Sequence, residues 1–379
     1  MTEKLKRKQK VLVLAPSLKS IGGVQNYIRT LVDALNAVLG SDRVRVVAVA
    51  GDPEVRDDGN LALSQSVKLR FLASAFATAV AWSPDLILCA HVGLAPAARL
   101  IQAVTRTPYW LVLYGIEVWG ELPAAKAKAL RGAERYVSIT RFTLDATIAR
   151  HHLKEPRVSI LPPTLLKSRP QAPDSNYVTS KDPVRPTVLT VGRIAASERY
   201  KGHDAILDAW PEVLRQVPEA IYLIVGDGND RRRLELRARE MGITDSVHFA
   251  GSVSPEELDV CYDRCSVFAM PARTELDARA PRGEGFGIVF LEAMAHGKPV
   301  VGPRMGAPAE FIRSGEHGLL VDPANSGELA GALIELLEDP VRAKRMGEAG
   351  KDWVAREFTF ERFCERLRDA LLESPLDNG

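Results

Sequence analysis

Short apolar runs without polar alternation recur along both halves of the chain, and each is followed by a stretch free of helix breakers. Four of these runs are residues 10–16, 85–90, 186–192 and 220–226. Such a run is typical of a strand in a parallel sheet that is covered on both faces. Strands that alternate with helices predict an α/β fold. Ligands of such folds bind at the carboxyl ends of the strands, so the loops after these runs are the first places to look for a site.

A change of composition divides this pattern in two. Residues 167–186 contain four prolines and three serines and have no apolar periodicity, which is typical of a linker. A chain of 379 residues is long enough for two domains. We therefore expect a first domain over residues 1–166, a linker over 167–186 and a second domain over 187–356. An amphipathic helical segment follows over 357–379.

The formal net charge of +2 excludes a general polyanion-binding surface, but the charge is uneven. Residues 1–165 hold 22 Lys and Arg against 13 Asp and Glu, an excess of nine positive charges, which leaves the rest with an excess of seven negative ones. Part of the basic excess is a tail near the start of the chain. Such a tail aids solubility or favours contact with an anionic membrane surface. Its basic residues are Lys4, Lys6, Arg7, Lys8 and Lys10.

No apolar run is long enough to span a bilayer, and the first residues lack the apolar segment of a secretory signal. The four cysteines have no spacing suited to disulfides, which indicates a reducing compartment. We expect a cytoplasmic protein, with peripheral contact to the inner face of the cytoplasmic membrane as an open alternative. No acidic cluster has metal-ligand spacing, so we expect no metal and no other cofactor.

The most informative stretch is residues 282–299. From Ile288 to His296 it is apolar almost all round and has no breaker, which predicts a buried helix that ends at Gly297. One carboxylate, Glu292, interrupts it. A buried carboxylate needs hydrogen-bond donors, which are either other side chains or the hydroxyls of a ligand.

The residues ahead of this helix are suited to bind an anion. Gly285, Phe286 and Gly287 bring backbone N–H groups and the positive end of the helix dipole toward the loop. Glycines also allow a bulky anion to approach closely. Glu284 stands at the edge of the same site, and an anion cradle between two carboxylates suits a sugar attached to a nucleotide diphosphate. The alternative is a buried turn and helix in which Glu292 is purely structural.

The E-x7-E spacing of Glu284 and Glu292, with the glycine, lysine and proline at 297–299, resembles the signature of retaining GT-B glycosyltransferases of the family-4 type, also called glycosyl transferases group 1. The resemblance is strongest over residues 188–323. It implies two Rossmann-like parallel-sheet domains that face a cleft, an acceptor domain followed by a nucleotide-sugar donor domain. It also implies that the C-terminal helix packs back on the first domain.

The resemblance further implies an activity. A hexose, mannose or glucose, would be transferred from a nucleotide diphosphate sugar to a glycan or lipid-linked saccharide, as in polysaccharide biosynthesis, with retained anomeric configuration. No carboxylate is placed as a covalent nucleophile, so we expect front-face substitution with the leaving phosphate as the base.

On the donor side, Arg193 and Lys201 would bind the diphosphate and stabilise negative charge on the leaving oxygen. Arg193, Lys201 and Glu284 are the expected catalytic residues. Arg199 is the alternative to Lys201, and a solvated pair on a surface turn is the alternative to both. Glu284 would hold hexose hydroxyls and Glu292 ribose hydroxyls. The phosphates and sugar would lie against Gly285, Phe286, Gly287 and Ile288, and the loop at Val253 would hold the base.

Two features of the first half match the family less closely. Gly22 and Gly23 open a helix after the first strand, where the family has a Gly-Gly loop that borders donor and acceptor. We expect these glycines to contact the donor; the other interpretation is a plain turn. Tyr114 stands directly before Gly115 and three positions before Glu117, where the family has a histidine. A phenol still binds a sugar hydroxyl but is not a cation near neutral pH.

We expect Tyr114 and Glu117 on the acceptor side, together with His91, which ends another predicted strand. Such a histidine more often bonds its own loop. Two other functions stay open: a sugar-nucleotide epimerase or phosphorylase of similar fold, and a donor-binding protein without catalysis, which the tyrosine at position 114 would suit. A nicotinamide-dependent oxidoreductase is disfavoured because no G-x-G-x-x-G follows the first strand.

Overall fold

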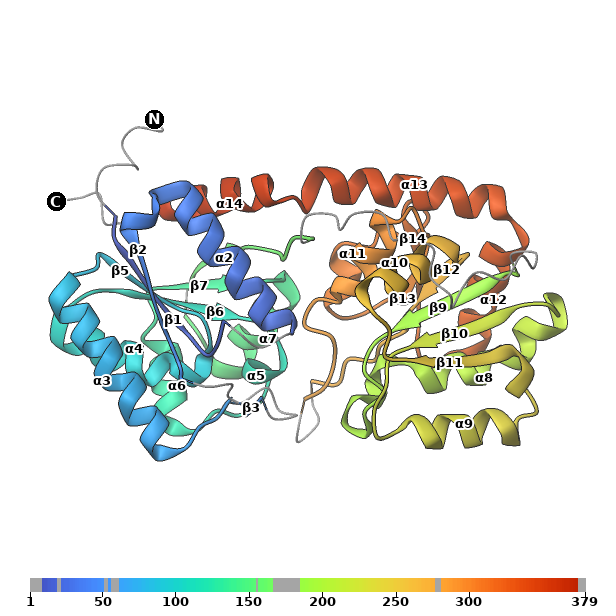
Figure 1. Cartoon of the computed structure of the whole chain (residues 1–379), viewed down its shortest axis with the longest axis horizontal. Coiled ribbons are helices and arrows are strands. Elements are labelled where there is room, and N and C mark those ends of the chain that lie inside the picture. The colour runs from blue at the N-terminus through green and yellow to red at the C-terminus, as the bar shows by residue number, and fades with distance from the viewer. Residues whose placement is uncertain are drawn as a thin grey trace. The chain divides into compact units, whose positions relative to one another are not determined.

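The computed structural model describes residues 9–18, 22–50, 54–55, 61–154, 156–165, 185–276 and 281–373. The chain forms two compact units (Figure 1). Unit 1 consists of Met1–Thr164, Leu276–Pro281 and Phe358–Gly379, and unit 2 of Leu165–Glu275 and Arg282–Glu357. Most of the predicted linker, residues 167–184, lies outside the described residues, as does the basic tail up to residue 8.

Unit 1 is built on a six-stranded parallel sheet in the order β2-β1-β5-β6-β7-β8. Strands β1, β5 and β6 are buried along their whole length, as their apolar sequences predict. The strands are β1 (Val11–Ala15), β2 (Val44–Ala48), β5 (Leu86–Cys89), β6 (Tyr109–Leu113), β7 (Arg135–Ser138) and β8 (Arg157–Ile160). A short antiparallel pair, β3 (Glu54–Val55) with β4 (Leu61–Ala62), stands apart from this sheet.

Helices cover both faces of this sheet (Figure 1). On one face α2 packs against α14, and on the other α4 packs between α3 and α6. The helices are α2 (Gly23–Leu39), α3 (Gln65–Trp82), α4 (Ala95–Thr105), α5 (Ile116–Trp119), α6 (Ala124–Arg131), α7 (Arg141–His151) and α14 (Phe360–Leu372). The C-terminal α14 is amphipathic, and its buried Phe363 meets the ring of Tyr27 on α2 edge to face at 5.6 Å.

Unit 2 repeats this architecture with a parallel sheet in the order β11-β10-β9-β12-β13-β14. The strands are β9 (Thr187–Val191), β10 (Ile221–Val225), β11 (Val247–Gly251), β12 (Val267–Ala269), β13 (Val300–Pro303) and β14 (Gly318–Val321). The helices are the 3₁₀ turn η3 (Ala196–Lys201), α8 (His203–Gln216), α9 (Arg231–Glu240), α10 (Pro255–Arg264), α11 (Ile288–Ala295), α12 (Ser326–Glu338) and α13 (Pro340–Glu357).

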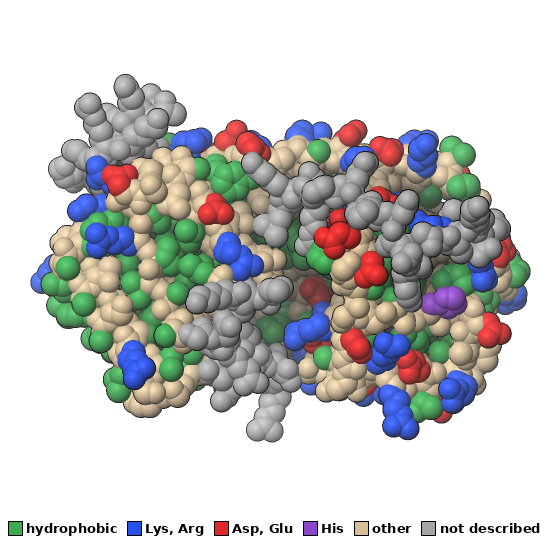
Figure 2. Space-filling model, in the orientation of Figure 1, with side chains coloured by type: hydrophobic (Ala, Val, Ile, Leu, Met, Phe, Trp, Pro, Cys, Tyr) green, Lys and Arg blue, Asp and Glu red, His purple; other side chains and the backbone are tan. Residues whose placement is uncertain are grey.

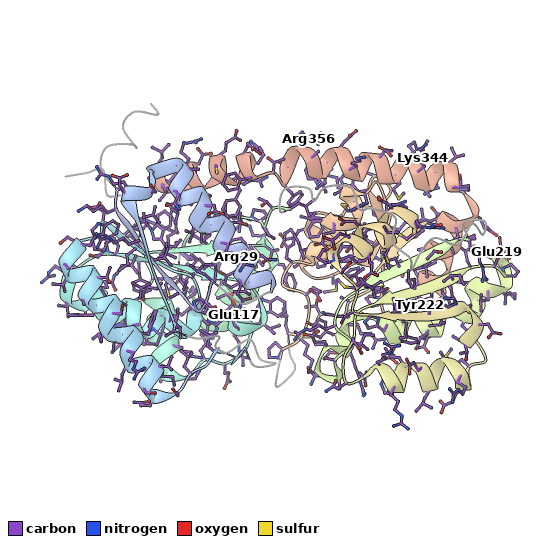
Figure 3. The ribbon with its side chains drawn as sticks, in the orientation of Figure 1. Arg29, Glu117, Glu219, Tyr222, Lys344 and Arg356 are labelled. Carbon is purple, nitrogen blue, oxygen red and sulfur yellow. The ribbon has the colours of Figure 1, made fainter. Side chains whose placement is uncertain are left out.

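The core of unit 2 lies between this sheet and its helices. The buried rings of Trp210 on α8 and Tyr222 on β10, the latter labelled in Figure 3, lie 5.5 Å apart. The indole N–H of Trp210 donates to Oγ of Ser246 at 2.9 Å, so the one polar group of this buried side chain has a partner. The two doubly covered parallel sheets confirm the predicted pair of Rossmann-like domains.

Candidate functional site

The strand order of unit 2 reverses between β9 and β12. Strand β9 is followed in the sheet by β10 and β11 on one side, whereas β12 is followed by β13 and β14 on the other. Open α/β sheets bind ligands outside the carboxyl ends of their strands at such a reversal. Gly192 and Arg193 follow β9, and Met270 and Pro271 follow β12. The candidate site is built from the loops at this end of the sheet.

Three charged side chains from the segment after β9 form an ion-pair cluster. The guanidinium of Arg193 pairs with Oε1 of Glu198, and the ammonium of Lys201 lies 2.9 Å from Oε2 of the same carboxylate. The second contact is an ion pair without the geometry of a hydrogen bond. The side chain of Arg193 is 77% exposed, whereas those of Lys201 and Glu198 are only 13% and 12% exposed. Lys201 is thus held within the protein, and Arg193 reaches in from the surface.

Glu284, on the loop ahead of α11, interacts electrostatically with this cluster. The side chain keeps some exposed surface, but its carboxyl group is surrounded by protein, and this burial raises its pKa. The charge of Lys201 opposes the shift, that of Glu198 adds to it, and that of Arg193 opposes it. Burial, with the charges of Glu284 and Glu198, also raises the pKa of Tyr200, which stays protonated. The three residues predicted to be catalytic therefore interact electrostatically within unit 2, and their catalytic roles stay a prediction.

Gly192 and Gly202 lie at the two ends of the segment that carries Lys201. Gly192 lies against the side chain of Lys201, because a Cβ added there would lie 3.5 Å from Nζ. Gly202, with φ of +90°, precedes α8, and a Cβ there would lie 2.4 Å from the carbonyl oxygen of Pro271. Glycine alone combines this conformation with so close an approach. The turn that carries Lys201 is therefore fixed against the loop after β12.

The start of α11 has the backbone that the anion cradle requires. Gly287 precedes the helix in the left-handed conformation, with φ of +88°, and provides no side-chain cap. A Cβ at Gly287 would lie 2.9 Å from the ring of Phe290. The buried Phe286 stacks on Phe311 at 4.7 Å and anchors the loop, while Ile288 is half-buried. Gly285 lies between Glu284 and this anchor. Phosphate contacts along 285–288 stay a prediction.

Glu292 is a half-buried residue of α11, in the helix that its sequence predicts. Its Oε2 accepts a hydrogen bond of 2.9 Å from the hydroxyl of Tyr262 on α10. Tyr262 is buried, and this burial, followed by the charge of Glu292, raises the pKa of the phenol well above its ordinary value. The carboxylate thus has a donor of the kind that burial requires. The assignment of Glu292 to ribose hydroxyls stays a prediction.

The remaining donor-side residues lie on a loop of unit 2 and at the start of helix α2 in unit 1. Val253 is half-buried in the loop between β11 and α10, directly before Ser254, which caps α10 through a capping box with Glu257. In unit 1, α2 begins at Gly23 with Gly22 before it, so the glycine pair does open a helix. Contacts of Val253, Gly22 and Gly23 with a donor stay predictions.

The acceptor-side residues of unit 1 are engaged with their own backbone. Tyr114 is buried, and its hydroxyl donates to the carbonyl of Ala90 at 3.0 Å. The carboxylate of Glu117, labelled in Figure 3, accepts a hydrogen bond of 2.7 Å from the N–H of Tyr114, and burial raises its pKa. Nδ1 of His91 accepts from the N–H of Gly93 at 2.9 Å, so this histidine bonds its own loop. Contact of these three residues with an acceptor stays a prediction.

Sequence reasoning misses three residues of this site: Glu198, Tyr200 and Tyr262. The first had a local signal, because it stands three positions before Lys201 and an acid and a base at that spacing often pair. Tyr262 had none, since its partner lies 30 positions away. In the described parts of the chain, no group of three or more His, Cys, Asp or Glu side chains could hold a metal ion.

The profile of the family described as "Glycosyl transferases group 1" matches residues 176–353. The chain is also similar to the GDP-mannose-dependent alpha-(1-6)-phosphatidylinositol monomannoside mannosyltransferase of Mycobacterium tuberculosis. The two sequences are 32% identical over 297 residues, an alignment that covers 76% of this chain and 73% of the relative. The chain belongs to this family. It is a glycosyltransferase, which is the main function expected from its sequence rather than one of the alternatives.

A second relative is similar over nearly as much of the chain. It is the GDP-mannose-dependent monoacylated alpha-(1-6)-phosphatidylinositol monomannoside mannosyltransferase of Corynebacterium glutamicum, which is 32% identical over 275 residues and covers 69% of each chain. No helix in the described part of this glycosyltransferase is long and apolar enough to cross a membrane.

Solved structures show the same fold. The sucrose-phosphate synthase of Thermosynechococcus elongatus superposes with a TM-score of 0.75 at 21% identity, over 96% of this chain and 99% of the other. Anabaena HepE in complex with UDP superposes with a TM-score of 0.73 at 18% identity, over 96% and 100%. The predicted GT-B architecture of this glycosyltransferase is thereby confirmed.

Proposed function

We propose that this glycosyltransferase moves mannose from GDP-mannose to a lipid-linked saccharide at the inner face of the cytoplasmic membrane, with retained anomeric configuration and without a metal ion. The donor and acceptor classes are supported by two relatives that are named for GDP-mannose and for phosphatidylinositol mannosides. The structural observation that carries the proposal is the cluster of Arg193, Lys201 and Glu284 at the switch point of unit 2.

In this proposal Arg193 and Lys201 bind the diphosphate of the donor. Both cations contact the carboxylate of Glu198, and a diphosphate brings more negative charge than that single group. Negative charge grows on the leaving phosphate oxygen as the glycosidic bond breaks, and cations held in place stabilise it without reorganisation. They thereby perform the charge stabilisation that a divalent ion supplies in other enzymes.

The two carboxylates hold the sugars at either end of the diphosphate. Glu284 accepts hydrogen bonds from hydroxyls of the mannose, and Lys201 favours its ionised form against the effect of burial. Glu292 accepts hydrogen bonds from the ribose hydroxyls, with its orientation supported by Tyr262. The N–H groups at the start of α11 meet the phosphates between them.

The bond changes of this transfer balance without an added base. The bond between C1 of mannose and the β-phosphate oxygen breaks, and a bond from C1 to the acceptor hydroxyl oxygen forms on the same face. The proton of that hydroxyl passes to the leaving phosphate oxygen, which gives GDP and the mannoside. Positive charge that develops at C1 is offset by the departing phosphate, as expected for an oxocarbenium-like transition state.

A direct assay tests the proposal. The protein is incubated with EDTA, a mannosylated phosphatidylinositol acceptor and, in turn, GDP-mannose, GDP-glucose, UDP-glucose and UDP-galactose, and the product is analysed by NMR. We expect GDP-mannose to be preferred and the product to be the α-mannoside. A β-mannoside would contradict retention, and loss of activity in EDTA would contradict metal independence. Epimerised sugar or sugar phosphate from the donor alone would support the rival epimerase or phosphorylase.

Variants test the residue roles. Lys201→Met should lower kcat/KM by about 10²- to 10³-fold, the effect of losing a group that acts on developing charge. Glu284→Gln should also lower kcat/KM, because the amide binds the mannose hydroxyls less strongly than the carboxylate does. Arg215→Met is a matched control, because it removes an exposed arginine of the same unit whose ion-pair partner is Glu212. If the two site variants turned over like the control, the assignment of this cluster to catalysis would be wrong.

A further inference from the structure

The carboxylate of Asp230, at the start of α9, has an unusual set of partners. An aspartate in this position commonly accepts hydrogen bonds from the first N–H groups of its own helix. Among the described residues, the side chain of Asp230 forms no such bond, and it is only 6% exposed. Hydrogen bonds from Arg233 and, to a lesser extent, from Arg199 lower its pKa to about 2 against the effect of burial, so it is ionised at neutral pH.

The bond from Arg199 fixes one side of the turn η3. Nε of Arg199 donates to Oδ2 of Asp230 at 3.0 Å, and Nη2 donates to Oδ1 at 2.8 Å. Such a two-pronged bond sets the plane of the guanidinium as well as its position. Arg199 stands two positions before Lys201, so the bond holds the part of the turn that leads to the ammonium.

The bond from Arg233, the third residue of α9, extends this network to α8. Nη2 of Arg233 donates to Oδ2 of Asp230 at 2.6 Å. Nη1 and Nη2 of Arg233 also donate to the two carboxylate oxygens of Asp204, each at 2.7 Å. Burial opposes ionisation of Asp204, but the bonds from Arg233 outweigh it and lower its pKa. Asp204 follows Lys201 by three positions, so Lys201 is held on both sides by residues at the start of α9.

Backbone hydrogen bonds tie the loop before α9 to the residue that follows Arg193. The N–H of Ile194 donates to the carbonyl of Asp227 at 2.9 Å, and the N–H of Asp230 donates to the carbonyl of Ile194 at 3.0 Å. This approach requires Gly228, because a Cβ there would lie 2.2 Å from the carbonyl oxygen of Ile194. The loop that ends at Asp230 therefore supports the segments of both cations that are assigned to the diphosphate.

The alternative is that α9 is a charged surface helix without a role in the site. Figure 2 shows basic and acidic side chains interspersed over this helix (lower right), as expected for a solvated face. Asp230 differs from those side chains because it is buried. A buried carboxylate is costly unless it is fully bonded, so its place between two arginines indicates a structural demand at the turn that carries Lys201.

We propose that Asp230 is a positioning residue for Lys201, and that Arg199 transmits this effect to the turn rather than binding the diphosphate itself. A cation that is held in place stabilises charge on the leaving oxygen without reorganisation, which is the benefit of a fixed turn. The inference rests on the proposed function, because it adds a supporting residue to the assignment of Lys201 to the diphosphate.

The first test needs no donor. The charge of Lys201 favours the ionised form of Glu284, so displacement of the ammonium should raise the pKa of that carboxyl group. In Asp230→Asn, carboxyl ¹³C NMR should show this pKa rising toward the value in Lys201→Met. Removal of a negative charge has the opposite direct effect on a neighbouring carboxyl group, so a rise reports the movement of Lys201. An unchanged or lowered pKa would overturn the proposal.

The second test is titration calorimetry with GDP. Asp230→Asn and Arg199→Met should each bind GDP about tenfold more weakly than the wild type, because a charge-assisted hydrogen bond that holds the turn is lost. If Arg199 itself bound the diphosphate, Asp230→Asn would release it and would bind GDP at least as tightly as the wild type. That result would overturn the proposal.

A double variant keeps the proposal testable if Asp230→Asn does not fold, because the side chain of Arg199 is half-exposed and tolerates change. If Arg199 acts through Lys201, Arg199→Met/Lys201→Met should bind GDP like Lys201→Met alone. Losses that add in the double variant would mean that Arg199 has its own contact with the diphosphate, and the proposal would be wrong.

Arg342→Met is the matched control. It removes a similarly exposed arginine of unit 2, whose ion pair with Glu335 joins α13 to α12. It should keep the wild-type affinity for GDP and the wild-type pKa of Glu284. If the wild type did not bind GDP, the proposed function would be at fault, whereas the NMR titration without donor would still decide the role of Asp230.

Discussion

The hydroxyl of Tyr262 donates a hydrogen bond of 2.9 Å to Oε2 of Glu292 and so joins α10 to α11. The phenol ring stacks on His296 at 5.3 Å, and Nδ1 of His296 lies 2.7 Å from Oδ1 of Asp263. Because burial holds the pKa of Tyr262 well above its ordinary value, the phenol stays a donor at every physiological pH. Tyr262 is therefore a positioning residue for the carboxylate that is assigned to the ribose.

Tyr262→Phe removes this hydrogen bond and keeps the ring. A hydrogen bond to a charged group contributes roughly 1.5–3 kcal/mol, so the KM for the donor should rise about 10-fold or more while kcat changes little. Steady-state kinetics with varied GDP-mannose give both constants. A fall in kcat at constant KM would contradict a role in binding the ribose.

A 2′-deoxy nucleotide separates positioning from a general loss of structure. Wild-type protein should bind GDP more tightly than 2′-deoxy-GDP, and Tyr262→Phe should reduce this preference, because the two changes affect one interaction and are not additive. Isothermal titration of both proteins with both nucleotides completes the cycle. Equal loss of affinity for the two nucleotides would indicate a structural role alone.

The carboxylate of Glu198 contacts both cations that are assigned to the diphosphate. An incoming diphosphate must compete with it, so Glu198→Gln should bind GDP about fivefold more tightly, since an ion pair of this partly exposed kind contributes roughly 1 kcal/mol. Glu212→Gln is the matched control, because its partner Arg215 is exposed and outside the cluster. Weaker GDP binding in Glu198→Gln would mean instead that Glu198 orients Lys201 for the ligand.

The raised pKa of Glu284 gives a second test of the cluster. Burial favours the neutral acid, and the charge of Lys201 favours the carboxylate. Removal of that charge in Lys201→Met should therefore raise the pKa of Glu284 further. Carboxyl ¹³C NMR titration of the labelled protein measures this pKa directly, and Glu284→Gln identifies the signal. A pKa that is unchanged in Lys201→Met would place the two groups too far apart to share a substrate.

Much of the fold could be predicted because its signals are local. The buried strand β1 is an unbroken apolar run, and α11 has an apolar sequence that ends at a glycine, so neither needs a distant residue to identify it. Helix α13 lacks such signals. Its sequence is charged, and its Gly347 and Gly350 disfavour a helix unless packing requires them. A Cβ at Gly347 would lie 1.9 Å from the carbonyl oxygen of Gly297, so this contact explains the glycine.

The residues of the candidate site also differ in whether a local sequence signal predicts them. Arg193, Lys201 and Glu284 stand in short stretches that resemble the motifs of the family, and in the structure their charges interact. The hydrogen bond of Tyr262 depends on how α10 packs against α11, and no spacing along the chain encodes it. The ligand roles themselves depend on a bound donor and stay predictions.

Stability at acid pH should depend on His203, which lies at the start of α8 with its ring 3.4 Å from the hydroxyl of Tyr222. Burial, with the charge of Lys201, lowers its pKa from 6.5 to about 4. A depressed pKa means that the unfolded chain binds the proton first, so stability is full above pH 6.5 and falls as the pH drops toward 4. The loss approaches about 3 kcal/mol at about 1.4 kcal/mol per pKa unit.

Urea unfolding at pH 7.5, 6, 5 and 4 measures this loss. His203→Gln should unfold with a shallower dependence on pH, whereas His248→Gln, which changes an exposed histidine of the same unit, should keep the wild-type slope. If His203→Gln and wild type lost stability in parallel, other groups would be responsible for the acid sensitivity.

Arg135 of β7 holds the end of the C-terminal helix within unit 1. Its buried guanidinium donates to Oγ of Ser159 on β8 at 2.8 Å and to the carbonyl of Glu373 after α14 at 3.2 Å, and it lies over the ring of Trp110 at 5.1 Å. Arg135→Met keeps an apolar stem over Trp110 but removes these hydrogen bonds and the ion pair with Oε2 of Glu373. A hydrogen bond from a charged group contributes roughly 1.5–3 kcal/mol to stability.

The free energy of unfolding of unit 1 should fall by that amount, and α14 should become the first segment cut in limited proteolysis, because its C-terminal end loses its contact with β7. Arg362→Met is the control: Arg362 is on the same helix, but its side chain is largely exposed and its ion pair is with Glu365, one turn along. Removal of such an exposed pair changes stability by less than about 1 kcal/mol. Equal proteolysis of the two variants would mean that the packing of Phe363 on Tyr27, and not the guanidinium of Arg135, keeps α14 on the unit.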